Sequence, residues 1–138
     1  MEFNKMQDLR VEDVMSTALI VAKVDESITD ADFDMRLANI RHIPVVDEKY
    51  RLTGIVSDRD VLRTLGKSKK RLVQVREVMT SDVCTIEHSA LASEALRQML
   101  ENKFGCLPVT GEQGQLVGMV TETDFLRIAH DVLQGNVG

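Results

Sequence analysis

The chain has few residues of several types that mark common functional classes. Its 138 residues include no tryptophan, one tyrosine, two prolines and two cysteines. Cys84 and Cys106 stand outside any CxxC pattern, so we expect both to pack in the core rather than to serve redox or metal chemistry. The three histidines, His42, His88 and His130, are too scattered to indicate a zinc site.

Long apolar runs and an excess of positive charge are also missing. No apolar stretch approaches the roughly 18 to 20 residues that span a membrane, and residues 1–10 lack the apolar core of a signal peptide. With 17 Lys and Arg against 22 Asp and Glu, the net charge is −5, whereas broad contact with a phosphate backbone needs a basic face. The sequence predicts a cytoplasmic protein that binds neither a membrane nor a nucleic acid.

Motifs of catalysis and of phosphate loops are absent as well. The chain contains neither GxxxxGK(S/T) nor GxGxxG, and its serines, histidines and cysteines form no catalytic order. We therefore expect no enzyme activity and no required cofactor, while one small anionic ligand stays compatible with the charge balance.

The chain is instead organised around a segment that occurs twice. Leu52–Arg63 reads LTGIVSDRDVLR and Leu116–Arg127 reads LVGMVTETDFLR, at an offset of 64 residues. Pro44 and Pro108 keep the same offset. A similarity that occurs only twice indicates a duplicated unit rather than a solenoid, which needs about three repeats or more.

The duplication predicts how the chain is divided. Because a domain of about 60 residues is marginal on its own, we expect the two copies to share one core in one compact module. The basic stretch Gly66–Arg71 either forms a solvated loop or contacts a phosphate. The expected parts are a loose arm at 1–10, a first repeat at 11–66, a linker at 67–74, a second repeat at 75–133 and a frayed tail at 134–138.

Hydrophobic periodicity predicts the same elements in both repeats, namely a short turn, a strand, a helix, a hairpin and a closing helix, and so an α/β (α+β) fold. The expected ranges are 11–15, 19–22, 29–40, 43–46, 52–56 and 58–65, then 75–79, 84–86, 89–103, 107–110, 115–120 and 122–133.

The first long helix has two apolar stripes. Ala31 and Met35 recur at helical spacing and form a core face, while Phe33, Leu37 and Ile40 lie roughly opposite. Either loops of the chain cover this second stripe or another subunit does.

Each copy of the repeated segment places an aspartate three positions after a hydroxyl residue, as Ser57 and Asp60 and as Thr121 and Asp124. This spacing is close to a capping box, which closes a helix start without any ligand. The same groups also suit a sugar-phosphate, because a carboxylate accepts from ribose hydroxyls and free helix amides attract a phosphate. The spacing alone leaves both interpretations open.

Together these motifs resemble a known family. Two copies of (D/E)VM, (D/E)AxxxM, (I/L)PV and a hydrophobic-G-hydrophobic-V-(S/T)xxD segment look like a tandem CBS-domain pair, the Bateman module, of the stand-alone bacterial type. The resemblance covers about residues 11–131. It implies two β-α-β-β-α repeats packed about a pseudo-two-fold axis, two clefts that bind adenosine nucleotides, and homodimers formed through helices.

The resemblance also implies the residues of two nucleotide sites. The first would use Ser57 and Asp60 for the ribose, with Arg59 and His42 near the phosphate and with adenine held by Ile55, Thr80, Thr85, Phe104 and Gly105. The second would use Thr121 and Asp124, surrounded by Met119, Ser16, Val21, Ile40 and Arg41.

The two implied sites differ in charge. Cys106 stands where the first repeat has His42, and Glu122-Thr123 replaces Asp58-Arg59. A carboxylate near a phosphate is unfavourable, so we expect the first site to bind a charged ligand more tightly, or to be the one that is filled. His42 has the alternative of a hydrogen bond to backbone.

The leading functional prediction is a regulatory module that senses AMP, ADP or ATP, or a related compound such as S-adenosylmethionine or NAD. It would act on a separate regulated protein or through its own homodimer, with Phe33 and Leu37 as the candidate interface. The alternative is a structural dimerisation module without a nucleotide. A nucleotide hydrolase is a third reading, for which the sequence offers no metal cluster or general base.

Overall fold

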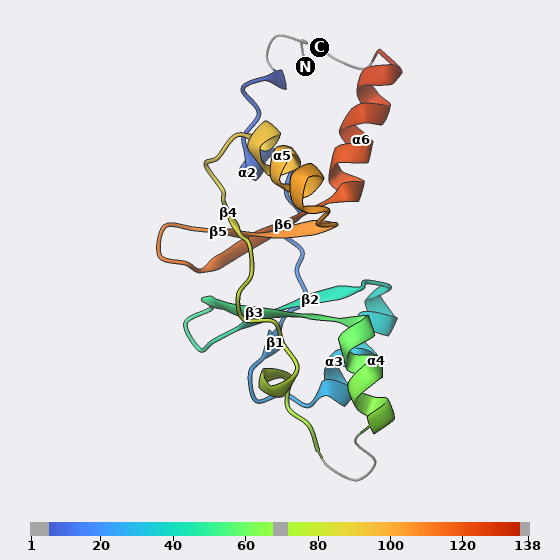
Figure 1. Ribbon diagram of the computed structural model, residues 1–138. Coiled ribbons are helices and arrows are strands. Elements are labelled where there is room, and N and C mark those ends of the chain that lie inside the picture. Colours follow the sequence, from blue (N-terminus) through green and yellow to red (C-terminus); the bar gives the residue numbers. More distant parts are fainter. Residues whose placement is uncertain (1–5, 68–71, 136–138) are drawn as a thin grey trace. The chain divides into compact units, whose positions relative to one another are not determined.

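The computed structural model describes residues 6–67 and 72–135. The chain divides into two compact units. The first unit is Ile20–Val83, and the second unit combines Met1–Leu19 with Cys84–Gly138. Each unit contains one three-stranded sheet, and Figure 1 shows the helices of each unit beside its own sheet.

The first unit follows the order β-α-β-β-α that the family resemblance implies. Strand β1 pairs in parallel with β2, which pairs antiparallel with β3 in a hairpin. Ser27 begins α3, because its side chain accepts a hydrogen bond from the Asp30 amide. Its elements are β1 (Ala22–Lys23), α3 (Ile28–Ala38), β2 (His42–Val46), β3 (Leu52–Ser57), α4 (Asp58–Lys67) and the 3-10 turn η1 (Val75–Glu77).

The second unit repeats this order, with β4 parallel to β5 and β5 antiparallel to β6. Both hairpins shift register near the turn, at Val45/Val46 and at Val109/Thr110. The duplicated sequence therefore produces duplicated strand pairing, irregularity included. Its elements are α2 (Val11–Val14), β4 (Ile86–Glu87), α5 (Ala92–Asn102), β5 (Cys106–Thr110), β6 (Leu116–Thr121) and α6 (Glu122–Leu133).

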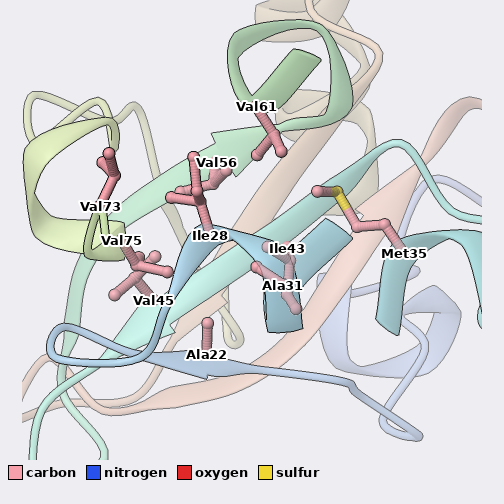
Figure 2. Close-up of a cluster of buried hydrophobic side chains, with 10 residues drawn as sticks. All are labelled: Ala22, Ile28, Ala31, Met35, Ile43, Val45, Val56, Val61, Val73 and Val75. Atoms are coloured by element: carbon pink, nitrogen blue, oxygen red, sulfur yellow. The ribbon is translucent and has the colours of Figure 1, made fainter. Parts of the chain in front are cut away.

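Each unit has its own hydrophobic cluster. In the first unit, side chains from the three strands meet α3 and α4 in one buried group (Figure 2). Val73, near the end of the linker, and Val75, at the start of the second repeat, complete this group. The cluster consists of Ala22, Ile28, Ala31, Met35, Ile43, Val45, Val56, Val61, Val73 and Val75.

Short segments pair with the hairpin of the other sequence repeat. Thr80, from the second repeat, exchanges two backbone hydrogen bonds with Ile55 of β3, at 3.0 and 2.9 Å. Ser16, from the first repeat, pairs in the same way with Met119 of β6, at 2.8 and 3.0 Å. Each compact unit is thus completed by a segment of the other repeat.

The repeated glycine explains how this close pairing is accommodated. A Cβ at Gly54 would lie 2.8 Å from both the Thr80 carbonyl oxygen and the Met79 sulfur. A Cβ at Gly118 would lie 2.6 Å from the Met15 sulfur. Both distances are shorter than real Cβ contacts, so a larger residue at either position forces the neighbouring segment away.

Several sequence-based expectations are wrong in detail. The arm is not loose throughout, because the Leu9 carbonyl accepts from the Ala92 amide at 2.8 Å. Cys84 is exposed rather than buried in the core, and Cys106 is half-buried. The helix expected at 89–103 is α5, which begins at Ala92, since a turn and the Leu91 cap come first. Residues 68–71 of the basic stretch and residues 136–138 of the tail lie outside the described residues.

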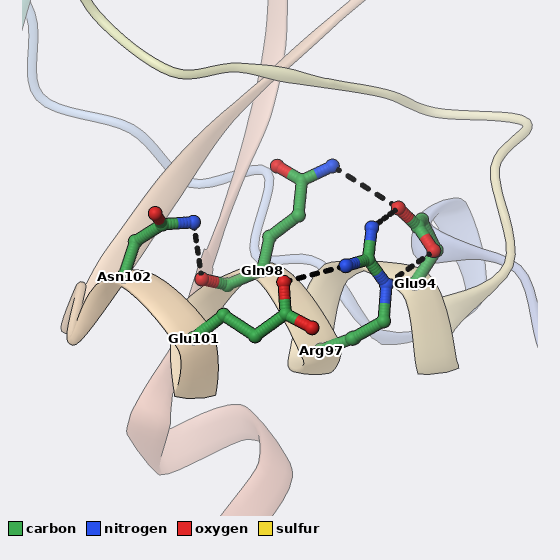
Figure 3. A network of polar contacts seen from close by, with 5 residues as sticks. All are labelled: Glu94, Arg97, Gln98, Glu101 and Asn102. Carbon is green, nitrogen blue, oxygen red and sulfur yellow. Dashed lines mark hydrogen bonds and ion pairs between the residues drawn. The ribbon is translucent and has the colours of Figure 1, made fainter.

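The outer faces of α3 and α5 are chemically opposite. Phe33 and Leu37 of α3 are 62% and 76% exposed, so no described loop covers these two residues. Ile40, expected in the same stripe, instead follows the end of α3 and packs against the first cluster. At the equivalent positions of α5, 64 residues later, Arg97 bonds Glu94 and Glu101 (Figure 3). Arg97 holds the pKa of the Glu94 carboxyl below its usual value. At these two positions α3 exposes apolar side chains, whereas α5 has an ionic network.

Candidate functional site

The first motif lies where β3 passes into α4. The Ser57 hydroxyl accepts from the Asp60 amide at 3.1 Å, and the Asp58 amide donates to the Arg41 carbonyl at 2.9 Å. His42 lies directly opposite Ser57 in the hairpin register. These contacts use the backbone of the first helical turn and leave the Asp60 carboxylate out of the cap.

The Asp60 carboxylate is open to solvent. Its side chain is 32% exposed, and among the described residues its ion-pair partner is Arg63, at 3.6 Å. Arg59 is exposed on the same helical turn. Thr80 joins the site through its pairing with Ile55, two residues before Ser57. The Ser57 hydroxyl, the Asp60 carboxylate and Arg63 thus lie together at the start of α4, and Thr80 pairs with the strand that leads to them. That these groups form a nucleotide site stays a prediction.

The second motif lies at the junction of β6 and α6 and has a different hydrogen-bond pattern. Asp124 Oδ2 accepts from the Thr121 amide at 2.8 Å and from the Thr121 hydroxyl at 3.2 Å. The Ser16 hydroxyl donates to Asp124 Oδ1 at 3.3 Å. Asp124 is only 7% exposed. Here the carboxylate itself closes the helix start, so both of its oxygens already have donors.

The surroundings of the second motif are also less basic. Cys106 lies opposite Thr121, where the first motif has His42 opposite Ser57. Burial, together with the charge of Glu122, raises the pKa of the Cys106 thiol to about 11. A neutral thiol and Thr123 thus stand where the first motif has an imidazole and Arg59, while both motifs keep a carboxylate, Asp58 or Glu122.

The capping interpretation of the motifs is therefore confirmed in both copies, but by different atoms. In the first copy the serine hydroxyl caps the helix, and in the second the aspartate carboxylate does. Sequence spacing could not separate these two arrangements, because both use the same residue types three positions apart. Asp60 is left outside the cap in the first copy, whereas Asp124 already accepts three hydrogen bonds in the second.

The remaining predicted site residues are divided between the two units. Gly105 lies at the second motif, where its carbonyl accepts from the Glu122 amide at 3.1 Å, and Arg41 lies at the first. The roles assigned across the units stay predictions. Thr85, Phe104 and Gly105 belong to the second unit, whereas Val21, Ile40 and Arg41 belong to the first.

Sequence reasoning missed one residue of the first motif. Arg63 was not assigned to the site, although it approaches Asp60 from the next turn of α4. Its i,i+3 spacing from Asp60 is the signal that could have identified it. Within the described ranges there is no group of three metal-ligating side chains. Nor does any described helix have the length and apolar character needed to cross a membrane.

Comparison with known proteins gives a family and a fold. The sequence profile of the CBS domain matches residues 11–67 and again 75–131. The chain is similar to a structure described as an acetoin utilization protein from Vibrio cholerae, with 35% identity and a TM-score of 0.83 over 91% of this chain and 93% of that one. The order and pairing of elements in each unit therefore match a solved protein.

Two further similar structures contain adenosine compounds. One is CBSX2 from Arabidopsis thaliana in complex with AMP, with 29% identity and a TM-score of 0.79 over 90% of this chain and 98% of that one. The other is the CBS domain pair of protein MJ0100 with 5'-methylthioadenosine and S-adenosyl-L-methionine, with 30% identity and a TM-score of 0.77 over 88% and 95%.

The chain spans very different shares of its curated relatives. It covers 23% of an inosine-5'-monophosphate dehydrogenase from Methanocaldococcus jannaschii, at 31% identity, and 93% of a CBS domain-containing protein from Dictyostelium discoideum, at 33% identity. The same module thus occurs both within long proteins and as most of a short one.

Proposed function

The chain belongs to the CBS-domain family, and on that premise we propose that it is a regulatory module that binds an adenosine nucleotide or a related adenosyl compound. The observation that carries the proposal is the start of α4, where the Asp60 carboxylate stays open beside a capped helix terminus. Similar structures with AMP and with S-adenosyl-L-methionine support the same class of ligand.

The chemistry of the first motif suits a ribose and a phosphate. A carboxylate accepts from both ribose hydroxyls, and the positive end of the α4 dipole attracts an anion even though the Asp58 and Asp60 amides already have acceptors. Arg59 and His42 add donors at the phosphate end, whereas the second motif has Thr123 and Cys106 there. We expect the first site to bind the charged ligand more tightly, with AMP, ADP and ATP as the first candidates and S-adenosylmethionine and NAD as alternatives.

The module acts without catalysing a reaction of its own, as a cytoplasmic sensor whose ligand changes packing in a homodimer or on a regulated partner. A ligand can shift such an equilibrium only if it binds the two arrangements with different affinities. The exposed Phe33 and Leu37 of α3 favour the homodimer. The same observation supports the second candidate function, a structural dimerisation module without a nucleotide.

Thermal unfolding with and without AMP, ADP, ATP, NAD and S-adenosylmethionine tests the proposal. A ligand at about 100 times its dissociation constant adds roughly 2.7 kcal/mol, a shift on the order of 10 °C for a domain of this size. Asp60→Ala should remove most of the shift, while Asp131→Ala on α6, which is exposed and outside both motifs, should keep it. If none of the five compounds shifts the midpoint, the dimerisation module is the better account.

A further inference from the structure

The two aspartates of the repeated motif differ in how many donors already occupy them. In the second unit, Asp124 Oδ2 accepts two hydrogen bonds from Thr121, and Oδ1 accepts one from Ser16. In the first unit, the residue equivalent to Ser16 is Thr80, and among the described contacts Thr80 does not bond Asp60. The Ser16 contact is therefore a property of one copy and not of the fold.

Ser16 is held in place by its backbone rather than by its side chain. Its amide and carbonyl both bond Met119, and Met15 packs against Gly118 with no space for a Cβ between them. The segment cannot move away without breaking two backbone hydrogen bonds. The Ser16 hydroxyl therefore stays next to Asp124, and only its rotation about the Cα–Cβ bond is free.

A ribose needs the acceptor that Ser16 occupies. A carboxylate has about four lone-pair positions, and three of those of Asp124 are taken. Two ribose hydroxyls require two positions, so one donor must leave. The Thr121 amide is fixed at the start of α6, and the Thr121 hydroxyl shares Oδ2 with it. Ser16 is the described donor on Oδ1, so its departure clears that oxygen for both ribose hydroxyls.

We propose that Ser16 sets the affinity of the second site by competing with the ligand for Asp124. This inference rests on the proposed adenosine-binding function. Ser16 then opposes ligand binding instead of contacting the ligand, because its hydrogen bond to Asp124 stabilises the site without ligand. Ser16 is a specificity-determining residue: compounds that offer a single hydroxyl to Asp124 need not displace it, whereas an intact ribose diol must.

The test measures the second site alone, by calorimetry with AMP in an Asp60→Ala background. Adding Ser16→Ala frees Oδ1, and we expect the affinity of the second site to rise about tenfold, equivalent to about 1.4 kcal/mol. Ser16→Thr keeps a hydroxyl and should leave the affinity near that of the parent. Thr80→Ala, measured with Asp60 intact and Asp124→Ala, is the matched control and should not increase affinity at the first site.

The outcomes distinguish this inference from the function on which it rests. If Ser16→Ala lowers AMP affinity or leaves it unchanged while the first site still binds, the competition is refuted and the sensor function stands. If neither the wild-type chain nor any variant binds AMP, ATP or S-adenosylmethionine, the proposed function fails, and the inference fails with it. Urea unfolding of each variant verifies that a lost signal is not lost folding.

Discussion

At the scale of single residues, the repeated glycine is the position with the least tolerance. A Cβ at Gly54 would meet the Thr80 carbonyl oxygen at 2.8 Å, and backbone cannot turn aside as a side chain can. We expect Gly54→Ala to lower the free energy of unfolding by about 1–3 kcal/mol. Gly66→Ala in α4 is the control, since nothing lies within 4 Å, and it should be neutral or stabilising. Equal urea midpoints for the two variants would contradict this explanation.

The carboxyl of Glu26, also a single-residue feature, leads us to expect that the stability of the fold depends on pH. Its Oε2 is buried without a described hydrogen-bond partner, and burial, followed by the charge of Asp34, raises the pKa of its carboxyl. An acid whose pKa is raised on folding stabilises the fold below its unfolded pKa of about 4.5, and this stabilisation is lost as the pH rises through the folded pKa. Glu26→Gln should therefore raise the unfolding midpoint at pH 7 but not at pH 4. A lower midpoint at pH 7 would show that the charge is compensated.

At the scale of elements, the sequence predicts most of the fold because periodicity and turns are local. The range 122–133 expected for the last helix matches α6, and both hairpins lie where the proline-valine runs place them. The helix expected from position 89 starts at Ala92, since a sequence with several serines and alanines does not mark its cap. The site is less predictable: whether an aspartate caps its helix or faces solvent depends on rotamers that spacing does not record.

The predicted homodimer interface lies on helix α3. Phe33 and Leu37 are exposed, so Phe33→Glu with Leu37→Glu should change the stability of the monomer by no more than about 0.5 kcal/mol. Burial of both in a homodimer would place two charges against apolar surface, and the dimer should dissociate in sedimentation equilibrium. Arg97→Ala, at the equivalent position of α5, is the control and should leave the mass unchanged. A wild-type chain that is monomeric at every concentration would contradict the homodimer.

At the scale of the whole molecule, the repeats of the sequence and the compact units in space do not coincide. Sequence similarity assigns Val75 and Thr80 to the second repeat. Their contacts are with β3 and the cluster of the first unit. Such pairing across about 25 residues leaves no periodic trace in the sequence, and it was the resemblance to a known family that placed Thr80 near Ile55.

This exchange predicts how fragments of the chain fold. A fragment of residues 11–67 contains the whole first repeat but lacks Val73 and Val75, whose side chains are 5% and 0% exposed. It also lacks the Val73 carbonyl that accepts from the Ile28 amide at the start of α3. A fragment of residues 20–83 has a similar length and keeps these contacts. We expect circular dichroism to show a cooperative urea transition for 20–83 and none for 11–67, because only the first has a closed core. Two equally folded fragments would mean that each repeat suffices for itself and that the exchanged segments are dispensable.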